Sequence, residues 1–367
     1  MKIRLVVPEV KLRPSERPAT CRYCGHWRLH RHGAVRKSLR DHRVAQVRVE
    51  RYKCAACGRT FRHYPDGVTA QDQSQRTVVL AAVLYGLGLS CAASAAFLTA
   101  IGVSIARMSV WWDAQAAGEA LRQRRPRGSV RVLGVDETVY RVRGHEVLVG
   151  FVVDDISGET LNFTVLYGGD AASLLEWLAP YVEAMGVEVL VTDGHAAYGV
   201  VASALGVAHQ LCLAHVRKGV ARHLRAITAQ ASQTGDDAQV RRARTTIRTL
   251  VRELPADGHV QLWALHQRYL AHTPPRPGAQ ASVGYRLRLL TLALLEQWPK
   301  LCLARTRPEL GLDGTNNAAE RAIGKSKMRY KTMRGYKSLA GLHTGIALTQ
   351  WLYNGDVDHE LAPLIAA

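Results

Sequence analysis

Two pairs of cysteines near the start of the chain have the spacing of a metal site. Cys21 and Cys24 form the first pair, and Cys54 and Cys57 form the second. The two residues between the members of a pair allow both thiolates to reach one ion, and zinc takes four such ligands in a tetrahedron. Because four protein ligands leave no position open for a substrate, the sequence predicts a structural zinc ion.

Other interpretations of these cysteines stay open. His26 or His63 could replace one thiolate as a ligand, and the cysteines could be free or disulfide-bonded. The chain has seven cysteines, an odd number, and its first ten residues lack the form of a cleavable signal peptide. We therefore expect a cytoplasmic protein, because clustered cysteines in a reducing compartment bind metal more often than they form disulfides.

Two aspartates follow apolar runs of the kind that form buried strands. Asp136 comes after residues 132–135, and Asp193 comes after residues 189–192. An acid at the carboxyl end of a buried strand projects into the crevice where ligands bind in open α/β sheets. Magnesium prefers oxygen ligands and keeps several waters, so a few carboxylates are enough to hold it. Each acid alone could equally be a turn aspartate, but the pair predicts a shared cation site.

A third acid, Glu320, stands at the start of a predicted helix that continues into a basic run. Asn317 could cap that helix with Glu320 as its capping-box partner, which would be a purely structural role. Residues 321–337 carry seven basic and no acidic side chains. An acid beside so many cations is the arrangement that a metal-dependent phosphate site needs. The basic residues are Arg321, Lys325, Lys327, Arg329, Lys331, Arg334 and Lys337.

Positive charge is concentrated in two segments of the 367-residue chain. The net charge is +19, of which residues 1–65 contribute +13 and residues 321–337 contribute +7. Two basic segments on a nearly neutral remainder favour a nucleic acid as partner. The 47% content of hydrophobic residues excludes a disordered chain. Residues 77–106 lack charged side chains, but glycine, serine and threonine interrupt them, so we expect no membrane span.

The elements that must position these residues suggest an α+β protein of several domains. We expect a basic arm over 1–19, a zinc ribbon over 20–65 and a helix-turn-helix domain over 70–120. The predicted helices of that domain are Gln75–Leu84, Ala92–Thr99 and Ser104–Ala117.

A mixed sheet is expected over 129–212, followed by a helical insertion over 213–312 and closing helices over 313–367. Three strands in a meander precede a helix, a fourth strand and a second helix, so antiparallel and parallel pairs should combine. The predicted strands are Val130–Val135, Val147–Val153, Thr160–Leu166 and Val187–Val191, and the predicted helices are Ala171–Met185 and Ala196–Leu205.

These features together resemble bacterial insertion-sequence transposases of the DDE class that have a zinc-binding, helix-turn-helix N-terminus. The resemblance covers most of the chain, and the asparagine-rich motif before Glu320 is its most specific part. It implies a ribonuclease H-like core in which Asp136, Asp193 and Glu320 hold two Mg²⁺ or Mn²⁺ ions. The motifs that carry it are the two strand acids, Cys212-Leu213-Ala214-His215, and Asn316-Asn317-Ala318-Ala319-Glu320-Arg321 with the lysine-rich run after it.

The resemblance also implies a function. The chain would bind the terminal inverted repeats of its element and target DNA, as a homodimer or larger assembly, in bacterial cytoplasm at the nucleoid. The third predicted helix, which contains Arg107, would enter the major groove, and the basic run after Glu320 would contact phosphates. Cys212 and His215 could form a second metal site or a buried structural pair.

Two other functions stay open. A zinc-ribbon regulator derived from a transposase would bind DNA without cutting it, and would need none of the three acids. A structure-selective nuclease of the ribonuclease H-like class would keep the acids, but would not need the first 120 residues.

Overall fold

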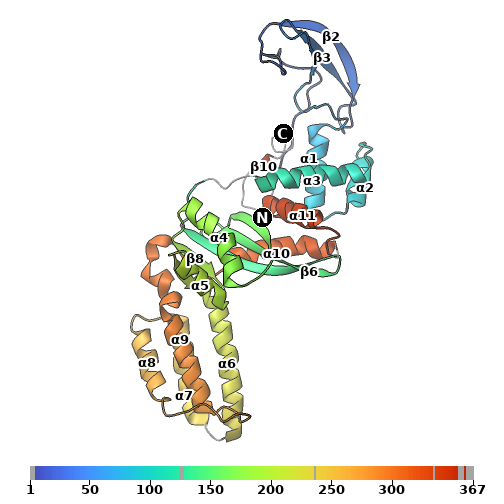
Figure 1. Cartoon of the computed structure of the whole chain (residues 1–367). Coiled ribbons are helices and arrows are strands. Elements are labelled where there is room, and N and C mark those ends of the chain that lie inside the picture. Colours follow the sequence, from blue (N-terminus) through green and yellow to red (C-terminus); the bar gives the residue numbers. More distant parts are fainter. Residues whose placement is uncertain (1–4, 124–127, 235–236, 334, 354–358, 361–367) are drawn as a thin grey trace. The chain divides into compact units, whose positions relative to one another are not determined.

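The computed structural model describes residues 5–123, 128–234, 237–333, 335–353 and 359–360 (Figure 1). The chain divides into two compact units. The first unit combines Met1–Pro126, Val139–Val147 and Ile323–Ala367, and the second combines Arg127–Thr138 and Leu148–Ala322.

An antiparallel three-stranded sheet forms the N-terminal part of the first unit. Its strands are β2 (Leu29–Ser38), β3 (Gln46–Cys54) and β4 (Thr60–His63), in that order. In the segment 1–19, which is expected to form a basic arm, Val10 is buried against this sheet with Val47 and Val49. A short strand, β1 (Leu5–Val6), pairs in parallel with β10 (His359–Glu360).

Helices pack together in the described remainder of the first unit, which also includes α10 (Asn317–Thr332) from Ile323 on. The others are α1 (Gln75–Gly86), α2 (Cys91–Ala100), α3 (Arg107–Gln123) and α11 (Leu339–Tyr353). Ser74 and Ser90 begin α1 and α2 by accepting the backbone N–H three residues on, as serine does at helix N-termini. Helix α11 packs against α1 and α3 through Leu348, Trp351 and Leu352, so the expected segment 313–367 divides between the two units.

A five-stranded mixed sheet runs through the second unit, with the order β7-β6-β5-β8-β9. Strands β5 and β8 pair in parallel, as do β8 and β9, whereas β6 and β7 are antiparallel. The predicted α+β class and mixed sheet are therefore confirmed, and the three strands, helix, strand and helix follow one another along the chain as expected for the ribonuclease H-like core. The strands are β5 (Val132–Val142), β6 (His145–Asp154), β7 (Thr160–Leu166), β8 (Val189–Thr192) and β9 (Ala208–Leu211).

Alternating residues of the central strands bury the two faces of this sheet separately. Leu133 and Leu190 pack under α4 (Ala171–Met185) and α5 (Ala196–Ala204). Val132 and Val189 point to the other face and pack against Leu310 of the 3₁₀ turn η1 (Pro308–Leu310). This alternation follows from the two-residue period of a strand. Packing on both faces holds β5 and β8, the strands next to Asp136 and Asp193, in place.

The expected insertion is a helical body with its own hydrophobic core. It contains α6 (Leu213–Thr234), α7 (Asp237–Glu253), α8 (Gly258–Gln267) and α9 (Val283–Thr306). Helix α10 (Asn317–Thr332) follows it. Within the described residues, no helix is both long and apolar enough to cross a membrane.

Candidate active site and metal centres

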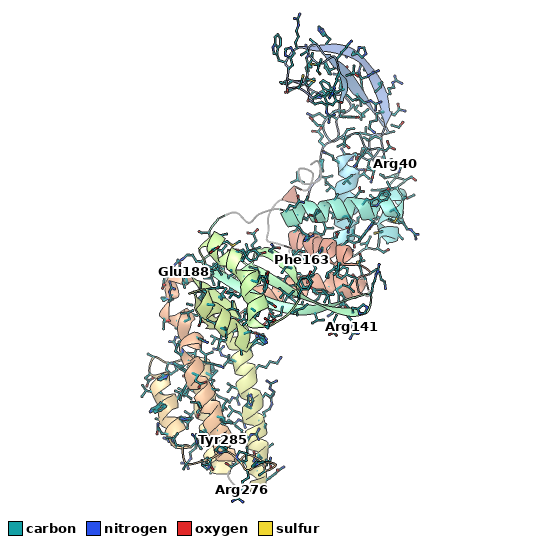
Figure 2. All side chains as sticks on the ribbon, in the orientation of Figure 1. Arg40, Arg141, Phe163, Glu188, Arg276 and Tyr285 are labelled. Carbon is teal, nitrogen blue, oxygen red and sulfur yellow. The ribbon has the colours of Figure 1, made fainter. Side chains whose placement is uncertain are left out.

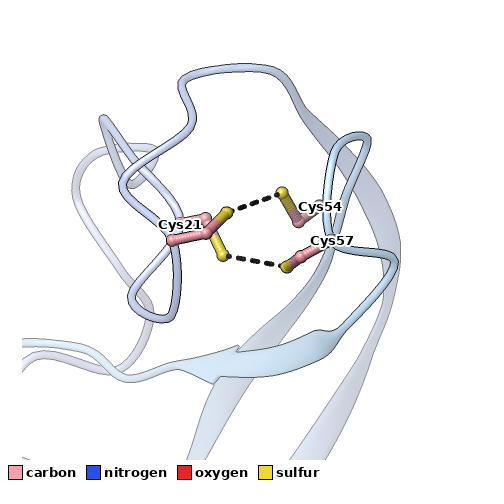
Figure 3. A group of neighbouring side chains, drawn as sticks. Cys21, Cys54 and Cys57 are labelled. Carbon is pink, nitrogen blue, oxygen red and sulfur yellow. Dashed lines mark hydrogen bonds between the residues drawn. The ribbon is translucent and has the colours of Figure 1, made fainter.

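The four cysteines of the N-terminal module lie together with the geometry that zinc requires. Cys21 Sγ is 3.8 Å from Cys57 Sγ, and Cys24 Sγ is 3.6 Å from Cys54 Sγ (Figure 3). Four thiolates at a Zn–S distance of about 2.3 Å in a tetrahedron are about 3.8 Å apart. All four sulfur atoms lie within 4.8 Å of one another, so the donor set fits a structural zinc ion.

The turns around the cysteines favour this site further. Gly25 and Gly58, which follow the second cysteine of each pair, have positive φ angles of 72° and 68°, and glycine adopts this conformation without strain. The pKa of the Cys54 thiol is lowered to about 7, chiefly because the backbone N–H of Cys57 donates to it. The alternative ligand His63 instead bonds the carbonyl of Glu16, at 3.0 Å from Nε2.

Asp136 and Asp193 occupy neighbouring positions because of the register between two parallel strands. Gly134 of β5 pairs with Val191 of β8, and the same register two residues on places Asp136 beside Asp193. Asp193 directly follows β8, as expected. Asp136 does not end its strand, because β5 continues to Val142, so that part of the prediction is wrong.

Three other carboxylates lie close enough to Asp136 to affect its ionisation. The pKa of Asp136 is raised to about 7, chiefly by burial and further by the carboxylates of Glu137, Asp193 and Glu320, although the N–H of Glu137 donates to it at 2.9 Å. A divalent cation would remove this cost, because opposite charge favours the ionised carboxylate. The donor set of three carboxylates suits Mg²⁺ or Mn²⁺.

Glu320 lies in the first turn of α10, and the residues before it are anchored to the sheet. The side-chain amide of Asn316 donates to the carbonyl of Val135 at 2.8 Å, next to Asp136. The backbone N–H of Asn316 donates to the sulfur of Cys212 at 3.3 Å. Asn317 is the first residue of the helix, not its cap, so the capping-box interpretation of Glu320 does not hold.

Cys212 and His215 stand beside Glu320. His215 Nδ1 is 3.4 Å from Glu320 Oε1, and ligand atoms of all three residues lie within 4.8 Å of one another. Cys212 is fully buried, whereas His215 is exposed. Among the described residues, the four-cysteine group and this group are the sets of three or more residues whose ligand atoms lie within 4.8 Å of one another. The carboxylates of Asp136, Asp193 and Glu320 do not meet this distance as a set.

Two further polar residues near the acids were missed from the sequence. Tyr198 of α5 donates a hydrogen bond to Glu137, the neighbour of Asp136. Asp155 directly follows β6, and burial together with Asp313 and Asp154 raises its pKa to about 7. Its position after an apolar strand was the available signal, the same one that identified Asp193.

The predicted DNA-contacting residues differ in their accessibility. Arg107, Arg321, Lys331 and Lys337 are exposed. Lys325 donates to the carbonyl of Tyr353 at 2.7 Å, and Lys327 Nζ lies 4.4 Å from the ring centre of Tyr140. Arg329 is only 2% exposed, and its guanidinium carbon lies 3.6 Å from the ring centre of Tyr85, so burial conflicts with a DNA contact. Arg334 lies outside the described residues.

Residues 178–344 match the model of a family described as the IS66 transposase family. The resemblance to insertion-sequence transposases of the DDE class is thereby confirmed. No curated protein matches the chain.

Two solved structures are similar at low identity and low TM-score. The catalytic core domain of BIV integrase is 12% identical and aligns over 45% of this chain and 84% of its own, with a TM-score of 0.21. A simian T-cell lymphotropic virus intasome in complex with the PP2A regulatory subunit B56 gamma is 13% identical and aligns over 58% of this chain and 67% of its own, also with a TM-score of 0.21. With such scores, the fold assignment rests on the strand order described above.

Proposed function

We propose that the chain, a relative of the insertion-sequence transposases, binds the terminal inverted repeats of its own element and catalyses metal-dependent DNA cleavage and strand transfer. The observation that carries this proposal is the strand register that sets Asp136 level with Asp193, with Glu320 near enough to raise the pKa of Asp136. A regulator that only binds DNA would have no use for three crowded carboxylates, which cost stability when no cation is bound.

The three acids would hold the metal, and neighbouring residues would hold the acids in place. Two divalent cations, when bound, would supply an activated water or DNA 3′-hydroxyl and stabilisation of the leaving oxygen. Asn316 fixes the start of α10, because its side chain donates to the carbonyl of Val135 and its backbone N–H donates to the sulfur of Cys212, so the Glu320 carboxylate is pre-positioned. In this scheme His215 orients Glu320 by approaching one of its oxygens.

DNA would be held by modules outside the acidic site. The zinc module carries much of the excess positive charge, since residues 1–65 contribute +13. Helix α3 would enter the major groove with the exposed Arg107 in its first turn. Arg321, Lys331 and Lys337 would contact phosphates, whereas Lys325 and Lys327 already have partners within the chain. Two DNA ends would be joined by two or more copies of the chain.

Cleavage of a duplex that ends in the element's inverted repeat tests this proposal. With Mg²⁺, the wild-type protein should cut at the repeat end, and Asp136→Ala and Asp193→Ala should each abolish cutting while repeat binding stays near the wild-type level. Glu183→Gln, which removes an exposed acid of α4, is the control and should cut normally. A chain that binds the repeats but never cuts with Mg²⁺ or Mn²⁺ would instead be the regulator.

A further inference from the structure

The helical insertion carries a third concentration of positive charge, in addition to those of residues 1–65 and 321–337. Residues 213–312 contain 16 basic and six acidic side chains, a net charge of +10. Nine of the basic residues lie in α6 and α7, where residues 213–253 include three acids. The two basic segments identified first are therefore accompanied by a third one, within the second unit.

The basic residues of α6 line up on its exposed side, starting at the active site. His215, Lys218, Arg222 and Arg225 recur at intervals of three, four and three residues, which places them on one face of a helix. The opposite side, with Leu224 and Ile227, is buried in the insertion core. At 1.5 Å per residue this stripe extends for about 15 Å from the histidine that approaches Glu320.

Helix α7 carries a second exposed row of basic residues. Arg241, Thr245, Arg248 and Arg252 also share one face, at intervals of four, three and four residues. A groove of about 380 Å³ between α6 and α7 is lined by Arg217, Arg248 and Arg252 and by two threonines, among other residues. Arg217 donates to the carbonyls of Val251 and Arg252, at 3.3 and 3.0 Å, and so joins the start of α6 to the end of α7.

Among the residues whose side chains the structure describes, few of the cations on these helices have the acidic partners that a solvated helix face usually has. Lys218 and Arg222 are four residues apart, as are Arg248 and Arg252, and like charges at this spacing destabilise a helix. Within the described residues, an ion pair is present for Arg252, with Glu253, but not for Arg222, Arg225, Arg241 or Arg248. A polyanion would relieve the repulsion along both helices at once.

We propose that the exposed face of α6 and α7, defined by Lys218, Arg222, Arg225, Arg241, Arg248 and Arg252, binds the phosphate backbone of duplex DNA beside the active site. This inference rests on the proposed function, because the DNA assigned to this face is the part of the duplex that extends beyond the active site. Arginine fits the role since its planar guanidinium can donate two hydrogen bonds to one phosphate. The stripe of about 15 Å matches the rise of roughly four to five nucleotides of one strand.

The test uses the full-length protein and a fluorescent 40-base-pair duplex of arbitrary sequence, with binding measured by anisotropy over a salt series. Each lost phosphate contact lowers the slope of log K against log salt by about 0.9. Arg222→Gln with Arg225→Gln should therefore reduce the magnitude of the slope by about 1.8. If the variant and the wild type bind equally at 1 M salt, the variant should bind about 30-fold more weakly than the wild type at 0.15 M salt. Arg241→Gln with Arg248→Gln should have a similar effect.

The matched control is Arg268→Gln with Arg276→Gln, which removes two exposed arginines. Arg268 directly follows α8, and Arg276, labelled in Figure 2, lies in the loop after it. Glutamine is a good helix former, so the variants should keep the helical circular dichroism of the wild type. Equal slopes for the control and both test variants would overturn the DNA-binding role of this face.

The proposed function and this inference can fail separately. A reduced slope in a protein that never cuts repeat ends would support the DNA-binding face and contradict the transposase activity. Normal cutting with an unchanged slope would overturn only the role of the face. A larger effect of the variants on duplex RNA than on duplex DNA would overturn the assignment to DNA.

Discussion

Asp113, a buried acid in the predicted recognition helix, should make the helical part of the first unit less stable as pH rises. Its carboxylate in α3 is 7% exposed and accepts one hydrogen bond, from Gln73 Nε2 at 2.7 Å. Burial raises the pKa of Asp113 to about 6 from an ordinary value of 3.8. The folded state therefore binds the proton more tightly than the unfolded state, and stability falls as pH rises from about 3.8 to about 6.

Asp113→Asn should remove this penalty while it keeps an oxygen acceptor for Gln73. A shift of about two pKa units corresponds to about 3 kcal/mol, so the variant should be more stable by up to about 3 kcal/mol above pH 6, and unchanged below pH 4. Hydrogen exchange of α3 amides should slow by up to about 100-fold at pH 7. Glu119→Gln, at an exposed position of the same helix, is the control. A gain in stability that is equal at pH 4 and pH 7 would refute the reasoning.

Three further results are expected. Cys24→Ser should lower the zinc content of protein purified under reducing conditions and unfold the zinc module, because metal binding energy is folding energy in such modules; wild-type protein without zinc would contradict this. Asn316→Ala should reduce cutting while DNA binding is kept, and lower the unfolding free energy by about 1–3 kcal/mol, since the buried carbonyl of Val135 loses its donor; wild-type cutting rates would refute the positioning role. Arg329→Met should leave the salt slope of DNA binding unchanged because Arg329 is buried, whereas Lys331→Met should lower it by about 0.9; the opposite ranking would show that Arg329 is released on DNA.

Local patterns were enough to predict strands β5 to β8 of the sheet, but not all of their ends and not strand β9. The bounds of β7 and α4 agree with the prediction, because apolar alternation and the cap at Asp170 are local signals. Strand β9 was missed because it has four residues and contains His209 and Gln210. These polar side chains have partners on other elements: His209 Nε2 lies 2.9 Å from Thr192 Oγ1, and Gln210 Oε1 accepts the N–H of Ala304.

The candidate site was only partly predictable for the same reason. The acids at Asp136, Asp193 and Glu320 could be named from strand ends and motifs, but not the register that brings the first two level. The brace between Cys212 and Asn316 joins residues more than 100 positions apart, and neither side chain signals it locally. Arg329 belonged to a run of cations, and only the packing of α10 against Tyr85 shows that it is buried.

Cleavage by Glu320→Gln is the measurement that tests the central claim most directly. Glutamine is a good helix former, so it should preserve the first turn of α10, but it lacks the negative charge that a divalent cation needs. We expect the variant to bind the inverted-repeat duplex like wild type and not to cut it with Mg²⁺, while the surface variant Glu176→Gln cuts normally. If Glu320→Gln cuts at the wild-type rate, Glu320 is not a metal ligand, and the proposed site with Asp136 and Asp193 is contradicted.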